Sequence, residues 1–222
     1  KILGEQGGTT IDQVRRDVLV AGTNVIYANG SARASVNTII DAGDLKTAIR
    51  TLERQNAKTI KEMVKPSTGI GTVAIRPAYI GLVHPDTVAV LESITGYTSI
   101  ENYSSQMDSM PDEVGAYRNI RFVKSTNAKV FTDGGASGGS NVISTTGTNA
   151  DVYATLILAA DAYGVIPLGG KAMENIVTGL GSGGSADPLK QRSTSGWKAQ
   201  TTTKILNDAW MCRIEHCCTS AL

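Results

Sequence analysis

The sequence predicts an α+β fold, with helices in the first third of the chain and short strands in most of the remainder. Apolar residues recur every three or four positions over residues 9–28 and 42–64, as expected for helices that bury one face. Beyond Pro66 the chain changes to short β-branched runs separated by glycine, proline and asparagine, a pattern typical of strands joined by turns.

Both helical segments have recognisable ends. Thr9 or Thr10 can cap the first helix, and Asn29-Gly30 can end it because both residues tolerate a positive φ. The segment 42–64 is the longest predicted helix, with an apolar stripe and charged residues around the rest of its surface. Pro66 is expected to stop it, since proline cannot continue the helical hydrogen-bond ladder.

The strand predictions depend on short runs of β-branched and aromatic residues. We expect strands at residues 72–75, 79–83, 120–124, 128–131, 165–168 and within 195–216. Residues 152–159 are apolar throughout, so periodicity does not separate a strand from a buried helix there. A short helix is predicted over 86–94 with Asp86 as its N-cap, and the segments 133–149 and 179–185 are predicted to be glycine-rich loops.

The charge balance argues against a dedicated nucleic-acid-binding protein. The chain has 21 basic and 20 acidic residues, a net charge of +1, and no basic patch or stripe. The densest basic stretch, residues 46–65, also contains Glu53 and Glu62 and is interpreted as a solvated helix face. Near-zero net charge gives little self-repulsion and so does not oppose association. No apolar run approaches the ~18 residues of a membrane span, so no membrane partner is expected.

Residues 135–139 match the G-x-S-x-G pattern of a serine nucleophile at Ser137. That chemistry needs a strand before the serine, a helix directly after it and a histidine base. No helix signal follows Ser137, and the pattern arises easily in a loop rich in glycine and serine. We therefore predict a flexible loop and retain a Ser137 hydrolase as the alternative from another functional class.

Two further patterns fall short of a functional motif. Residues 164–172 resemble a phosphate-binding loop, but Lys171 stands one place late and Ala172 lacks the hydroxyl that would hold magnesium, so a turn is predicted. His84 and Asp86 lie where a strand ends and a helix starts, a common place for catalytic residues. A proline turn with a capping aspartate is the simpler interpretation.

The cysteines are confined to the end of the chain. Cys212, Cys217 and Cys218 lie near His216, without the second pair of ligands that structural zinc sites use. An odd, clustered set is no disulfide framework, so a reducing compartment is expected. The aspartate pairs 41/44 and 108/112 are explained by capping of helices or turns. No catalytic residue, metal or cofactor is predicted, and two histidines with no cofactor motif favour a structural role.

A collinear series of short segments carries a resemblance to a known family. The segments are GEQGGTTIDQ (4–13), DVLVAGTNVIYA (17–28), STGI (67–70), RPAY (76–79), VHPD (83–86), EVG (113–115), RFV (121–123), DVY (151–153), AYG (162–164), DPL (187–189), GWK (196–198) and ILND (205–208). Together they resemble the major capsid protein family of short-tailed, podovirus-type phages that carry a virion RNA polymerase. Asp112 departs from the glycine that the family often has before Glu113, and the three-cysteine tail is no known family feature.

The resemblance implies the tailed-phage capsid fold, shared with herpesvirus shells and encapsulins. That fold has an extended N-terminal arm, a peripheral domain built on a long spine helix and a β-sheet, and an axial domain at the ring centre. On this interpretation residues 1–40 form the N-terminal arm and extended region. Residues 41–78 form the peripheral domain, with 42–64 as spine helix, residues 79–170 form mainly the axial domain, and residues 171–222 return to the peripheral domain.

The function implied by the resemblance is that of a structural major capsid protein and not an enzyme. Copies would assemble into the pentamers and hexamers of an icosahedral phage head that encloses double-stranded DNA. Implied partners are further copies, portal, decoration or scaffolding proteins, and packaged DNA contacted without sequence specificity. The implied location is the virion, after assembly in the bacterial host cytoplasm. The alternatives are an encapsulin-like compartment shell, a phage tail or adhesin module, and the Ser137 hydrolase.

Overall fold

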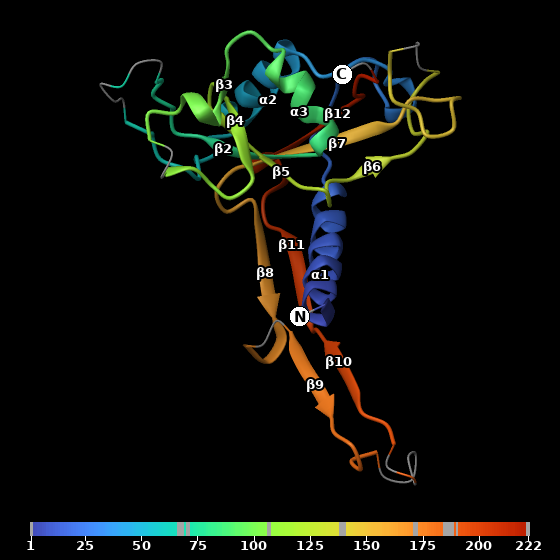
Figure 1. Ribbon diagram of the computed structural model, residues 1–222. Helices are drawn as coiled ribbons and strands as arrows, with labels where there is room; N and C mark the ends of the chain where they lie inside the picture. The colour runs from blue at the N-terminus through green and yellow to red at the C-terminus, as the bar shows by residue number, and fades with distance from the viewer. Residues whose placement is uncertain are drawn as a thin grey trace.

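The computed structural model describes residues 2–65, 69, 72–105, 108–137, 141–170, 173–183, 189 and 191–220. It has a compact body and a long, narrow arm (Figure 1). Within the described residues, an eight-stranded sheet forms most of the body, and four strands in two successive ribbons form the arm over residues 163–205. The arm projects on the side of the body opposite to helices α2 and α3 (Figure 1).

Helix α1 (Ile2–Val20) begins seven residues before the predicted helix 9–28 and ends eight residues before the end of that helix. Residues Val25–Tyr27 form strand β1 instead, because they pair in parallel with strand β12 (Met211–His216). Gly4, Gly7 and Gly8 weaken the helical signal, since glycine costs about 1 kcal/mol relative to alanine in a helix interior. Tertiary packing overrides that cost in the folded chain.

Helix α2 (Ala42–Arg54) ends ten residues before the predicted end at residue 64, so the long helix predicted there is wrong. Asn56 adopts a left-handed φ of 53°, and Ala57 N–H donates to Leu52 O (3.1 Å), which together form a helix-ending motif. Residues 57–65 continue as extended chain, with bridges from Lys61 to Ala78 and from Val64 to Ile75. Pro66, predicted to stop the helix, lies outside the described residues.

The capping interpretation of the Asp41 and Asp44 pair is confirmed. Each carboxylate accepts the other residue's backbone N–H, at 2.9 and 3.1 Å, in a reciprocal capping box at the start of α2. Helix α3 (Pro85–Glu92) has Pro85 in its first turn. Its N-cap is His84, whose Nδ1 accepts the N–H of Asp86, so the prediction of Asp86 as N-cap is wrong by two positions.

The body sheet has the strand order β1-β12-β7-β2-β5-β4-β3, with β6 also paired to β7. Its strands are β1, β2 (Tyr79–Val83), β3 (Tyr97–Ser99), β4 (Glu113–Tyr117), β5 (Ile120–Lys124), β6 (Val130–Phe131), β7 (Val152–Leu158) and β12. The predictions for β2 and β5 are confirmed at both ends. The apolar run 152–159 is the fully buried strand β7, while β3 and β4 were not predicted, and residues 72–75 form only isolated bridges.

Both faces of the sheet are covered. Helices α2 and α3 pack on one face, where Leu52, Leu91 and Ile157 belong to the main core. The C-terminal end of α1 packs on the other face, where Leu19 and Leu156 belong to a second cluster. Because successive residues of a strand point to opposite faces, β7 contributes Leu156 to one core and Ile157 to the other.

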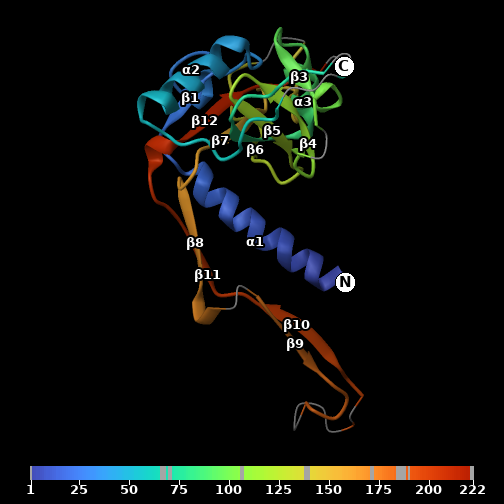
Figure 2. The ribbon, with the colours of Figure 1, turned by 90° about the vertical axis from the view of Figure 1, so that its left-hand side faces the viewer.

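The arm consists of ribbon β8–β11 (Tyr163–Pro167 with Thr201–Ile205) and ribbon β9–β10 (Glu174–Thr178 with Thr194–Lys198), both antiparallel. The strand predicted within 165–168 is confirmed as β8, and the strand character of 195–216 is confirmed as β10, β11 and β12. Strand β9 was not predicted. Figure 2 shows the arm bending between its ribbons, so that β9–β10 points to the same side as α1.

The body and the arm meet at residues 162–163 and 205–206. Residues 41–78 contribute α2 to the body, and residues 171–222 contribute both to the arm and, through β12, to the body sheet. None of the helices in the described part of the chain is long and apolar enough to cross a bilayer.

Candidate assembly surface

The arm exposes an unusual amount of apolar surface. Val177, Leu180 and Ile166 are 67%, 69% and 66% exposed. The other exposed apolar residues of the arm are Tyr163, Leu168, Met173, Ile176 and Leu189. An isolated two-stranded ribbon is marginally stable in water, and clustered exposed apolar residues mark interaction surfaces. The arm therefore has the composition of a surface that another protein covers.

Contacts within the chain hold the arm only weakly along its length. The Lys198–Glu174 ion pair across β9–β10 is 3.5 Å long and solvent-exposed, so it contributes little. The firmest contact comes from α1, where Gly7 is buried against the arm. A Cβ added there would lie 2.8 Å from Met173 Sδ and 3.2 Å from the ring of Trp197. Glycine at position 7 thus lets the helix lie directly on the arm.

A cluster of hydrogen bonds fixes the point where α1 and the arm join the body. The Asp208 carboxylate accepts from Thr23 N–H, at 3.0 and 3.1 Å, and from the Thr23 hydroxyl. Arg213 Nη1 donates to Gly22 O at 3.1 Å, and Leu206 N–H donates to Ala162 O at 2.9 Å. Helix and arm therefore leave the body from one anchored junction, which sets the direction of both.

A buried charge pair holds the opposite edge of the sheet. Arg121 on β5 donates to both carboxylate oxygens of Glu113 on β4, at 2.6 and 2.7 Å. The Tyr103 hydroxyl donates a hydrogen bond to the same carboxylate at 2.7 Å. The pKa of Tyr103 is raised, mainly because the side chain is buried and also because of this hydrogen bond. Asp112, which stands where the resembled family often has glycine, adopts a left-handed φ of 58°. Glycine adopts that conformation freely and aspartate tolerates it, so the departure keeps the local turn.

The geometry does not support Ser137 as a nucleophile. Ser137 is exposed, and its backbone bridges to Asn149 within the loop. His216 is fully buried, with Nε2 2.9 Å from Thr155 Oγ1 and Nδ1 2.9 Å from Cys217 O. His84 caps α3 beside Asp86. Among the described residues, neither histidine forms a hydrogen bond with Ser137, and Gly138 and Gly139 of the pattern lie outside them.

The C-terminal thiols are buried and unreactive. Burial raises the pKa of Cys212 and Cys218 to about 12 and that of Cys217 to about 11, so all three are neutral at physiological pH. Within the described ranges, no three side chains of His, Cys, Asp or Glu gather as a metal site requires. Lys171 and Ala172, from the phosphate-loop-like run, lie outside those ranges. Sequence reasoning missed the exposed apolar residues of β9, which carry no periodic signal of burial.

Comparison with known proteins assigns the family. A family model described as phage capsid protein matches residues 1–181, and the chain therefore belongs to this phage capsid protein family. No curated protein matches the sequence. This membership confirms the prediction of a structural phage capsid protein rather than an enzyme, and it makes the chain a virion component.

Solved phage structures share the fold. The chain is similar to the capsid structure of cyanophage P-SCSP1u, with 15% identity and a TM-score of 0.54 over 96% of this chain and 63% of that chain. The acidic stable capsid structure of Helicobacter pylori bacteriophage KHP30 matches with 10% identity and a TM-score of 0.53, over 98% and 69%. A structure from Mycobacterium phage Che8 matches with 14% identity and a TM-score of 0.50, over 95% and 60%. The chain thus spans 60 to 69% of the length of these three chains, and the likeness concerns the fold.

Proposed function

We propose that this capsid protein is the major shell subunit of a phage head and acts by assembling with copies of itself. The copies form pentamers and hexamers that close into an icosahedral shell around double-stranded DNA. The observation that carries this proposal is the arm, a thin β-ribbon whose exposed apolar residues have no core of their own to bury them. Contacts between different patches on identical subunits close into rings when the rotation between subunits allows it.

The arm offers enough apolar surface for a useful contact. In the described part of the arm, the exposed large apolar residues are Tyr163, Ile166, Leu168, Met173, Ile176, Val177, Leu180 and Leu189. At ~1.5 to 3 kcal/mol for each fully buried aliphatic or aromatic side chain, their burial yields on the order of 10 kcal/mol per arm. Much of that offsets the entropy lost on association, so each contact is modest and stability comes from many contacts in one closed shell.

The layout of the molecule suggests how the expected domains are distributed. We propose that α1 serves as the spine helix, because it is the long helix that runs beside the arm, whereas the predicted spine helix 42–64 stops at Arg54. The arm together with α1 would form the peripheral domain. The body would form the axial domain, which agrees with the assignment of residues 79–162 but moves α2 and β12 into it. The resembled lineage, short-tailed phages with a virion RNA polymerase, belongs to this proposal as well.

The proposed partners follow from the role as shell subunit. Packaged DNA would be contacted without strong phosphate binding, which suits a net charge of +1 because tight binding would resist packing and release. Portal, scaffolding or decoration proteins would complete the head, and assembly would take place in the host cytoplasm. An encapsulin-like shell with protein cargo is the second candidate within the same fold, and the contents of purified shells separate the two.

Mass photometry with electron microscopy tests the proposal on two proteins, wild type and an arm-shortened variant. The variant replaces residues 169–199 with Asn-Gly, which joins Leu168 to Gln200 where their backbones already pair (Leu168 N to Gln200 O, 2.8 Å). We expect rings of five and six or closed shells from wild type, and a folded but unassembled variant. A wild-type protein that stays monomeric at high concentration contradicts the proposal.

A further inference from the structure

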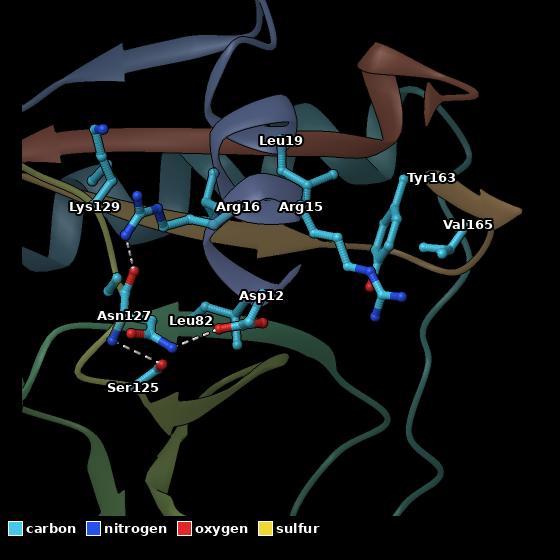
Figure 3. A pocket seen from close by; sticks show the side chains of 13 residues that line it. Asp12, Arg15, Arg16, Leu19, Leu82, Ser125, Asn127, Lys129, Tyr163 and Val165 are labelled. Carbon is cyan, nitrogen blue, oxygen red and sulfur yellow. Dashed lines mark hydrogen bonds between the residues drawn. The ribbon is translucent and has the colours of Figure 1, made fainter. Parts of the chain in front are cut away.

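A cleft opens where α1 crosses the body, at the base of the arm (Figure 3). Its volume is about 180 Å³. Asp12, Arg15 and Arg16 of α1 form one wall, Asn127 and Lys129 lie beyond the end of β5, and Tyr163 and Val165 of β8 form the side toward the arm. The cleft thus lies between the three parts whose relative position defines the shape of the subunit.

Most charged groups around this cleft are paired within the chain. Arg16 donates to Asn127 O at 2.7 Å and to Asp17 Oδ1 at 2.8 and 3.1 Å, and Lys129 Nζ lies 3.2 Å from the same oxygen. Burial opposes ionisation of Asp17, but the hydrogen bonds from Arg16 and Lys129 outweigh it and lower its pKa. Asp12 accepts from Asn127 Nδ2 at 2.9 Å.

Arg15 is the exception. Figure 3 shows its side chain running away from Arg16, toward Tyr163 and Val165. Its Nε is buried, and among the described residues it meets no hydrogen-bond acceptor and forms no ion pair. Arg15 as a whole is half-buried, but its buried Nε–H lacks an acceptor, which costs free energy. Among the described residues that line the cleft, Arg15, Arg16 and Lys129 are positive and Asp12 is negative. Asp17, which pairs with Arg16 and Lys129, adds a second negative charge beside the cleft, so three positive charges meet two negative ones there.

We propose that this cleft is a docking site for one carboxylate, from an Asp or Glu side chain of a second copy of the chain in the assembled shell. This inference rests on the proposed function. A carboxylate presents two acceptors in the plane of the guanidinium fork, so it satisfies Nε–H and one Nη–H together. It also supplies the missing negative charge.

The dimensions of the cleft favour a protein side chain over packaged DNA. A carboxylate on one or two methylene groups can enter a cleft of about 180 Å³ and reach the buried Nε. A phosphate of duplex DNA stays on the surface of a wide, stiff rod and cannot approach a donor below the protein surface. The position supports a neighbouring copy as the source, since the cleft adjoins the base of the arm that is proposed to contact neighbours.

The test compares wild type with Arg15→Gln, Arg15→Lys and a matched control, Arg50→Gln. Arg50 is exposed on α2, which packs on the opposite face of the sheet, and its replacement changes the net charge equally. The protein concentration for half-maximal assembly is measured without DNA and again with DNA. Thermal unfolding is measured on dilute, unassembled subunits.

We expect Arg15→Gln to raise the half-assembly concentration about 10- to 100-fold, which corresponds to the loss of a charge-assisted hydrogen bond. Arg15→Lys should give an intermediate increase, and Arg50→Gln should stay within about twofold of wild type. The unfolding temperature of the Arg15→Gln subunit should not fall, because Arg15 has no described partner in its own chain. If an Arg15→Glu protein is rescued by replacing one exposed Asp or Glu with lysine, that residue is the one that supplies the carboxylate.

Three results would overturn the inference. Arg15→Gln could assemble as readily as Arg50→Gln, or it could unfold at a lower temperature as an isolated subunit, which would give Arg15 a role within its own chain. A requirement for Arg15 that arises only when DNA is present would make the anion a phosphate. Failure of wild type itself to assemble is a different outcome, because it refutes the proposed function without reference to any variant.

Discussion

Replacing Arg121 by methionine should be among the most damaging single changes in the body. The Arg121 and Glu113 side chains are 2% and 0% exposed, and their two hydrogen bonds of 2.6 and 2.7 Å satisfy both carboxylate oxygens. Removing one member of a buried pair leaves the other charge buried without compensation, which costs ~3 to 5 kcal/mol. For a chain of 222 residues, each kcal/mol lowers the unfolding temperature by roughly 2 to 4 °C, so we expect a fall of about 6 to 20 °C.

The assay is urea and thermal unfolding of the unassembled subunit, carried out as a double-mutant cycle with Glu113→Leu. The double variant should recover most of the loss, because an apolar pair of similar volume needs no compensating charge. The Tyr103 hydroxyl and the Met110 N–H then lack their acceptor, and Asp108 O lacks its donor, so a residual cost of ~1 to 2 kcal/mol is expected, mostly from the buried Tyr103 hydroxyl. An Arg121→Met protein destabilised by less than about 1 kcal/mol would refute the reasoning, as would a double variant no more stable than the single ones.

Three further predictions follow from other parts of the molecule. Gly7→Val should loosen α1 from the arm, because the added side chain clashes with Trp197, and protease should then cleave within residues 2–10 faster than in wild type. Gly8→Val, on the exposed side of the helix, should change the cleavage rate only slightly. Equal cleavage rates of the two variants would contradict the contact between Gly7 and the arm. Asn56→Ala should lower the free energy of unfolding by ~1 kcal/mol, because residue 56 has a φ of 53° that alanine adopts less readily than asparagine. Asn56→Gly should leave that free energy unchanged. A glycine variant less stable than the alanine variant would contradict the role of Asn56 in ending α2. Burial lowers the pKa of His216 to about 4, below the ~6.5 of the unfolded chain. The neutral, buried His216 therefore contributes about 3 kcal/mol to the free energy of unfolding above pH 6.5, and this contribution is lost as the pH falls toward 4. Unfolding of His216→Gln between pH 7 and 4 should therefore depend less on pH than that of wild type, and an unchanged slope would assign the acid sensitivity to other groups.

The body could be predicted well where local pattern and burial agree. The bounds of β2 and β5 are the same in sequence and structure, because both are short β-branched runs bounded by turn residues. The end of α2 could not be predicted, since Ile60, Met63 and Val64 continue the helical spacing although Asn56 has already ended the helix. The apolar residues of 57–65 fit both the spacing of a helix and that of a strand. The backbone bridges to residues 75–78 are what make this segment extended in the folded chain.

The candidate assembly surface could not be predicted for a different reason. The apolar residues of β9 and of the described arm tip are exposed in the single subunit, so no burial pattern marks them as part of a fold. Arg15 is also hidden in the sequence, because a charged residue on a helix ordinarily faces solvent. The early start of α1 depends on Gly7 lying against Met173 and Trp197, residues more than 150 positions away. Membership of a phage capsid protein family, by contrast, could be predicted from twelve short segments that occur in one order, because such a match does not depend on how the chain packs.

Assembly through the arm is tested most directly by a cryo-electron microscopy reconstruction of the particles that the wild-type protein forms, resolved well enough to place side chains of the arm. We expect Ile166, Val177 and Leu180, exposed in the single subunit, to be covered by a neighbouring copy in every ring. Shells in which the arms project into solvent and only the bodies touch would contradict it.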